Sequence, residues 1–180
     1  GIKETLIGDP YYVGGGQHEI KRGGLLKVHV DFNKHPLLGL DRRLNVLIYL
    51  NEDWQESFGG HFELWNKSMK QCEKKILPSF NKLAIFSTTD ISYHGHPDPL
   101  MCPEDRSRKS LALYYYTNGR PKGEFRNASG QNTTIFKQRK NQKDRNSEFL
   151  HLSIKNTTKN ILRLVLPRAI IEKFKNNNPN

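Results

Sequence analysis

The sequence is poor in cysteine and contains no long hydrophobic run. Only two cysteines, Cys72 and Cys102, occur among its 180 residues. A disulfide framework needs more cysteines, and neither residue has the C-x-x-C spacing of a zinc site. We therefore expect free thiols in a reducing, cytoplasmic environment. No apolar stretch is long enough to cross a bilayer, so we expect no membrane partner.

The N-terminus lacks a starting methionine and the apolar segment of a signal peptide. We expect that an element upstream of Gly1 is missing.

Acidic residues are scarce in the last third of the chain. Residues 120–180 hold 14 Lys and Arg against 4 Asp and Glu, whereas residues 1–119 hold 15 against 14. The positive charge of 120–180 favours either a polyanionic partner such as nucleic acid or a plain solvated surface.

Helical periodicity is nearly absent before residue 119, where strand-like stretches occur instead. They are Leu25–Asp31, Leu44–Leu50, His61–Trp65, Lys82–Ser87, Ser92–Gly95 and Lys109–Tyr116, with Tyr11–Val13 as a further short candidate. Residues 66–79 read as a Lys-rich connector. Short strands separated by Gly and Pro turns predict an all-β sandwich or jelly roll over residues 1–119.

The composition changes after Gly119. Residues 120–147 are polar, basic and rich in Asn, which predicts a long loop. Apolar residues then recur at helical spacing from 161 to 166, and Pro167 must end or kink that helix. Ala169–Phe174 is a second short helical candidate. We therefore divide the chain into a β domain, 1–119, and a basic loop and helical extension, 120–180.

Histidines and one aspartate suggest a metal site in the β domain. His29 and Asp31 are two residues apart on a predicted strand, so their side chains point to the same face. They could equally be an ordinary charged strand face. A second imidazole can come from His94 or His96, which are also two residues apart. Two imidazoles and one carboxylate on one face of a divalent metal are typical of non-haem Fe(II) oxygenases.

An arginine beside this site could hold an acidic co-substrate, because guanidinium geometry matches a carboxylate in a bidentate way. Arg106 and Arg108 both precede the last predicted strand. Tyr49 is either a second polar contact or a core aromatic residue.

Four sequence blocks, in order, resemble the Fe(II)/2-oxoglutarate-dependent dioxygenases of the prolyl 4-hydroxylase-like type. The blocks are His29-Val30-Asp31, Ile48–Trp54 with Gly59-Gly60 beyond it, Ser92-Tyr93-His94, and Arg108 ahead of an apolar strand. The resemblance implies a double-stranded β-helix, a jelly-roll variant, with flanking helices that are mainly C-terminal.

The resemblance also implies roles for individual residues. His29, Asp31 and His94 would be the catalytic metal ligands, in preference to His96. Arg108 and Tyr49 would bind 2-oxoglutarate. The implied cofactors are Fe(II) and 2-oxoglutarate, with ascorbate as a stimulant.

The reaction implied by the resemblance uses dioxygen and 2-oxoglutarate to hydroxylate an unactivated C–H, releasing succinate and CO2. The substrate would be a prolyl residue in a peptide or protein, or a small molecule. One departure concerns this substrate, because Glu19 stands about ten residues before His29, where such hydroxylases carry a pocket tyrosine. The alternatives are a nucleic-acid base oxygenase or demethylase that uses the basic 120–180 region, and a non-catalytic jelly-roll binding module.

Overall fold

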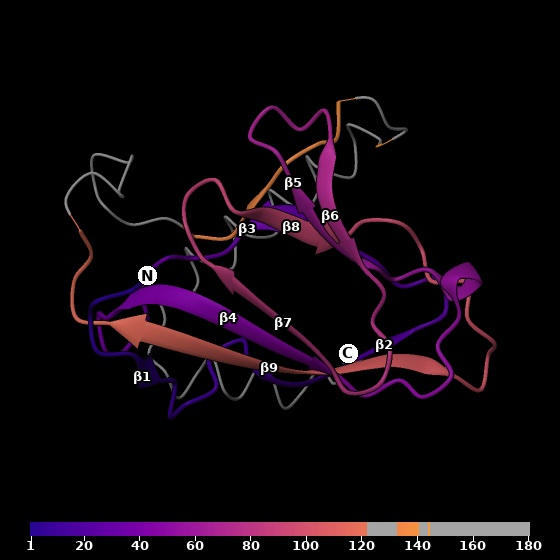
Figure 1. Ribbon diagram of the computed structural model, residues 1–180, viewed down its shortest axis with the longest axis horizontal. Helices are drawn as coiled ribbons and strands as arrows, with labels where there is room; N and C mark the ends of the chain where they lie inside the picture. The colour runs from indigo at the N-terminus through magenta and orange to yellow at the C-terminus, as the bar shows by residue number, and fades with distance from the viewer. Residues whose placement is uncertain (122–132, 141–143, 145–180) are drawn as a thin grey trace, which may run out of the picture. The chain divides into compact units, whose positions relative to one another are not determined.

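The structure, a computed structural model, describes residues 1–121, 133–140 and 144 (Figure 1). This part of the chain consists of ten strands and one short 3-10 helix. The strands are β1 (Ile7–Gly8), β2 (Gly16–Lys21), β3 (Leu26–Val30), β4 (Asp41–Tyr49), β5 (Phe62–Trp65), β6 (Cys72–Ile76), β7 (Lys82–Ser87), β8 (Tyr93–His96), β9 (Ser107–Thr117) and β10 (Ile135–Phe136), and the 3-10 helix η1 is Glu56–Phe58.

The strands form two antiparallel sheets (Figure 1). One sheet has the order β1-β9-β4-β7, with β2 also paired to β9, and the other has the order β10-β3-β8-β5-β6. The pairs are nested along the chain: β2 pairs with β9, β3 with β8, β4 with β7, and β5 with β6. Nested antiparallel pairing split between two sheets is the jelly-roll arrangement, so the predicted all-β double-stranded β-helix is confirmed.

Side chains from both sheets meet in a shared core. Tyr49 of β4 and Ala84 and Phe86 of β7 pack against Phe62 of β5 in the opposite sheet. Alternation along β9 turns Arg108, Ser110 and Ala112 to the buried side. The inward positions of β9 therefore place polar side chains next to an apolar core, and this is where the candidate site lies.

Several strands differ from the sequence expectation. The Lys-rich connector contains β6, whose CEKKI sequence has three exposed residues and so lacks apolar alternation. Strand β2 was missed for a similar reason, since Ile20 is the one apolar residue on its half-buried face. Tyr11–Val13 is not a strand, and both of its tyrosines are exposed.

The predicted loop over 120–147 is wrong at Ile135–Phe136, which form β10 at the edge of the second sheet beside β3. The helices expected at 161–166 and Ala169–Phe174 lie outside the described residues. The division of the chain at residue 119 remains a prediction. Cys72 and Cys102 are free thiols. Among the described residues, no helix is long and apolar enough to span a membrane.

Gly95 of β8 lies against the backbone of β3. A Cβ at this position would lie 2.6 Å from the carbonyl oxygen of Leu26 and 3.1 Å from that of Lys27. Both atoms belong to the backbone of the strand that carries His29. Only glycine therefore lets the two strands approach each other as closely as they do.

We predict that Gly95→Ala destabilises the protein by about 1–3 kcal/mol, because the added methyl group forces β3 and β8 apart. Urea unfolding followed by circular dichroism measures this change. Gly8→Ala in β1 is the matched control, since its Cβ would lie 3.8 Å from the Tyr115 ring, which is an ordinary contact. Equal stability of the two variants would contradict the close approach of the strands.

Candidate metal centre

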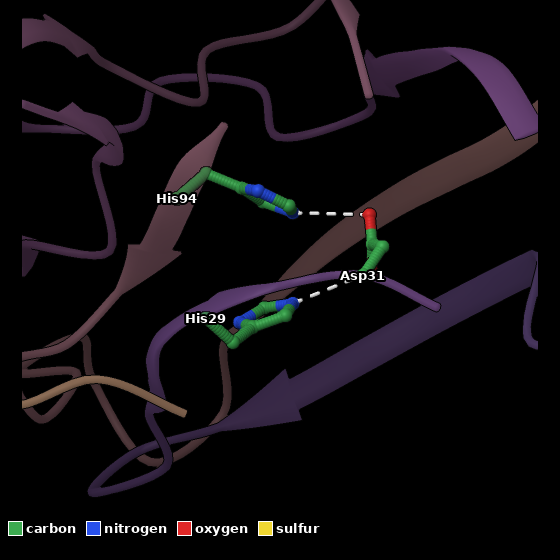
Figure 2. A group of neighbouring side chains, drawn as sticks. All are labelled: His29, Asp31 and His94. Atoms are coloured by element: carbon green, nitrogen blue, oxygen red, sulfur yellow. Dashed lines mark ion pairs between the residues drawn. The ribbon is translucent and has the colours of Figure 1, made fainter. Parts of the chain in front are cut away.

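Strand pairing brings two histidines and one aspartate together. His29 on β3 lies directly opposite His94 on β8, and Asp31 follows the end of β3. One ligand atom from each of the three lies within 4.8 Å of the others. Figure 2 shows both imidazoles directed at the Asp31 carboxylate, with Nε2 of His29 3.5 Å from Oδ1 and Nε2 of His94 3.4 Å from Oδ2.

The backbone determines which ring nitrogen of each histidine is available. Nδ1 of His29 lies 2.8 Å from the carbonyl oxygen of Lys27, and Nδ1 of His94 lies 2.8 Å from that of Ser92. A carbonyl oxygen only accepts, so each Nδ1 must carry the proton. The Nε2 lone pairs are then free to bind a metal, as is usual for metal-binding histidines.

A second layer of polar side chains holds Asp31. The Nδ2 atom of Asn45 donates a 2.7 Å hydrogen bond to Oδ2 of Asp31, and Nη2 of Arg42 lies 3.2 Å from the same oxygen. Arg42 itself donates from Nε to Oδ1 of Asn45 at 2.9 Å. Its guanidinium stacks on the rings of Tyr114 and Phe32, 3.5 and 4.6 Å from their centroids.

The protonation states of the cluster suit a divalent cation. Burial alone would raise the pKa of Asp31, but its interactions with His94, the Arg42 guanidinium and His29 together hold that pKa well below its usual value. Burial lowers the pKa of His94. An ionised carboxylate and a neutral imidazole are the forms that a metal ion requires.

A cavity of about 90 Å³ is lined by all three groups and also by Arg108 from β9. Arg108 is 4% exposed, and no carboxylate in the described part of the chain forms an ion pair with it. Its Nε donates a 2.8 Å hydrogen bond to the carbonyl oxygen of Gly60. A buried guanidinium without an acidic partner is costly, which indicates that an anionic ligand completes the pairing.

Tyr49 and Gly60 shape the surroundings of Arg108. The Tyr49 hydroxyl lies 3.5 Å from Nη2 of Arg108, and the guanidinium carbon is 5.0 Å from the Tyr49 ring centroid. Burial raises the pKa of Tyr49, so its hydroxyl stays protonated and can donate. At Gly60 a Cβ would come within 2.9 Å of the Arg108 side chain, so the Gly59-Gly60 turn gives the arginine room.

Of the two residues that competed for these roles, one lines the same cavity and the other does not. His96 faces the same cavity but is not part of the group of three ligand atoms. Arg106 points away, donating to the carbonyl oxygen of Glu52. Glu19 also points away from the cavity, accepting a 2.6 Å hydrogen bond from Ser107. His18 of β2 also lines the cavity.

Sequence reasoning missed the two residues that hold Asp31. Asn45 interrupts an otherwise apolar strand, LNVLIYL, and a lone polar residue in a buried strand is a usable signal. Arg42 precedes the predicted strand and carried no such signal. Its burial depends on the rings of Phe32 and Tyr114, which only the tertiary structure brings together.

We predict that Asn45→Ala weakens Mn²⁺ binding about 10- to 100-fold, because Asp31 loses the hydrogen bond that orients it. Isothermal titration calorimetry of the metal-free protein measures the effect. Asn51→Ala is the matched control, since this buried amide bonds the carbonyl oxygens of Pro78 and Lys109 rather than Asp31. Unchanged affinity in Asn45→Ala would show that Asp31 needs no such support.

The chain is similar in part to several known proteins. A mouse protein named prolyl 3-hydroxylase OGFOD1 is 32% identical over 79 residues, covering 42% of this chain and 14% of its own length. The chain therefore spans a small part of that relative. Among solved structures, a Phytophthora capsici prolyl 4-hydroxylase matches with 22% identity and a TM-score of 0.43, covering 56% of this chain and 31% of its own.

A Pseudomonas putida prolyl-4-hydroxylase structure matches with 20% identity and a TM-score of 0.42, covering 57% of this chain and 50% of its own. The sequence profile described as "2OG-Fe(II) oxygenase superfamily" matches residues 15–116, which include all three residues of the metal cluster and Arg108. By this match over more than half of its length, the chain belongs to the 2OG-Fe(II) oxygenase superfamily.

Proposed function

We propose that the protein is an Fe(II)- and 2-oxoglutarate-dependent hydroxylase that acts on a prolyl residue of a peptide or protein. One observation carries the proposal: a single cavity is lined both by the cluster of His29, Asp31 and His94 and by the buried Arg108, which has no acidic partner among the described residues. A divalent metal would bind the cluster, and a dicarboxylate would pair with Arg108.

The donor set fits Fe(II). Two neutral imidazoles and one carboxylate are the ligands of non-haem Fe(II) oxygenases, and they leave positions open for a co-substrate and dioxygen. We assign Nε2 of His29, Nε2 of His94 and the carboxylate of Asp31 as the ligand atoms. In support, both Nδ1 atoms face backbone carbonyl oxygens, which leaves both Nε2 lone pairs available.

Arg108 and Tyr49 are the proposed binding residues for the distal carboxylate of 2-oxoglutarate. The guanidinium can donate two parallel hydrogen bonds to a carboxylate, and the phenol can add a third. Burial of both side chains strengthens these bonds, because little water competes for them. The hydrogen bond from Arg108 to Gly60 fixes the direction in which the guanidinium points.

The remaining residues orient the ligands and exclude water. Phe86 and Phe62 pack 4.6 and 5.8 Å from the His94 ring, so one side of the site is apolar. Asn45 and Arg42 keep Asp31 ionised and in place. Bound Fe(II) would supply the oxygen chemistry, in which one atom of dioxygen enters the succinate formed, with CO2, from 2-oxoglutarate and the other enters the hydroxyl group formed on the substrate.

A prolyl substrate is proposed because the mouse relative is named as a prolyl 3-hydroxylase. The nucleic-acid alternative rested on the basic 120–180 region, most of which lies outside the described residues, and gains no support from the comparisons. To distinguish these substrates, the protein is incubated with Fe(II), 2-oxoglutarate and ascorbate in the presence of proline-containing peptides, free amino acids or single-stranded oligonucleotides. The substrate is the compound whose mass increases by one oxygen atom. Omitting ascorbate from the same assay tests whether it stimulates turnover.

We predict that 2-oxoglutarate is converted to succinate only when Fe(II) is present, and that His29→Ala and His94→Ala reduce this conversion to the metal-free level. Each variant removes one ligand from the cluster. His61→Ala is the control, because His61 bonds Glu56 at 2.6 Å and does not line the cavity. Full turnover in both ligand variants would refute the proposal, and a non-catalytic binding module would show no turnover in any form.

We predict that Arg108→Leu raises the KM for 2-oxoglutarate at least about 30-fold, since losing one partner of a buried charge pair costs about 2–5 kcal/mol. The KM of Arg108→Lys should lie between that of Arg108→Leu and that of the unmodified protein, because an ammonium keeps the charge but not the bidentate geometry. Steady-state kinetics at saturating Fe(II) measure both values. An unchanged KM in Arg108→Leu would place the co-substrate elsewhere.

A further inference from the structure

His96 is a buried polar side chain that the roles assigned above do not use. It follows His94 by two residues on β8, so both rings face the interior, and it lies opposite Leu26 of β3. It is 3% exposed and lines the same cavity as Arg108. In the described part of the protein, neither of its ring nitrogens has a hydrogen-bond partner.

In either protonation state, the imidazole of His96 carries at least one N–H donor. Leaving both ring nitrogens without a partner in a buried position is unfavourable, so a partner is expected from whatever enters the cavity.

The ring shares a cavity with both ends of the proposed site. Arg108, at the carboxylate end, His29, at the metal end, and His96 all line one cavity of about 90 Å³. A dicarboxylate that extends from the metal ligands to Arg108 therefore occupies the same small space as the His96 ring.

We propose that His96 binds 2-oxoglutarate directly, with one ring N–H donating a hydrogen bond to a carboxylate oxygen of the co-substrate. The inference rests on the proposed function and adds a third side chain to the co-substrate contacts, beside Arg108 and Tyr49. His96 is thus a co-substrate-binding residue, distinct from the metal ligand His94 two positions earlier.

The test compares His96→Leu, which removes the donor, with His96→Gln, which keeps an N–H group. Calorimetric titration of 2-oxoglutarate into Mn²⁺-loaded protein gives its Kd, and a separate titration gives the Kd for Mn²⁺. We expect His96→Leu to raise the Kd for 2-oxoglutarate at least about tenfold, equivalent to about 1.4 kcal/mol. We expect His96→Gln to recover most of the affinity, and the Kd for Mn²⁺ to stay constant throughout.

His61→Gln is the matched control, because this histidine lies outside the cavity. His96→Phe replaces His96→Leu if the latter does not fold. An unchanged Kd for 2-oxoglutarate in His96→Leu would mean that water or the substrate, rather than 2-oxoglutarate, forms the hydrogen bond with the His96 ring. That result would overturn the inference. Equal losses in His96→Leu and His96→Gln would overturn it too. Absence of 2-oxoglutarate binding to the unmodified protein would instead refute the proposed function, and this inference with it.

Discussion

The antiparallel pairing of β3 with β8 is the constraint on which the candidate site depends. It sets His29 opposite His94, with ring centroids 4.5 Å apart, and leaves Asp31 just beyond the strand end, where its carboxylate reaches both Nε2 atoms. The carbonyl oxygen of Lys27 in β3 accepts a hydrogen bond from Nδ1 of His29, and that of Ser92, just before β8, accepts one from Nδ1 of His94. One stretch of backbone therefore fixes the position, the orientation and the tautomer of two ligands at once. Gly95 allows the strands to approach this closely.

The cavity carries more polar groups than the described residues can satisfy. Within the described part of the chain, Arg108 has no acidic partner, and His96 has no hydrogen-bond partner at either nitrogen. Asp31, by contrast, is held by Asn45 and Arg42 before any metal is considered. The protein thus holds the metal ligand Asp31 in position before a metal binds, whereas Arg108 and His96 remain available to contact a co-substrate. Such an arrangement lowers the stability of the ligand-free protein and is expected where binding supplies the missing partners.

Much of this arrangement could be predicted from sequence, and the failures have physical causes. Period-two spacing put His29 and Asp31 on one face, and the apolar strands of the core gave the fold class. Spacing could not separate His94 from His96, because residues two apart on a strand face the same way. Only the register of β8 against β3 separates them. Strands such as β6 were missed because exposed edge strands need no apolar side chains. Arg42 was missed because the rings that bury it are distant in sequence.

The central claim is that one cavity binds both a divalent metal and 2-oxoglutarate. A crystal structure of the protein grown without oxygen, with Mn²⁺ and 2-oxoglutarate, tests it most directly, because Mn²⁺ is located by its anomalous scattering. The account predicts one anomalous peak among His29, Asp31 and His94, with the dicarboxylate extending from it to Arg108. An anomalous peak away from these three residues, or a dicarboxylate that does not reach Arg108, would contradict it.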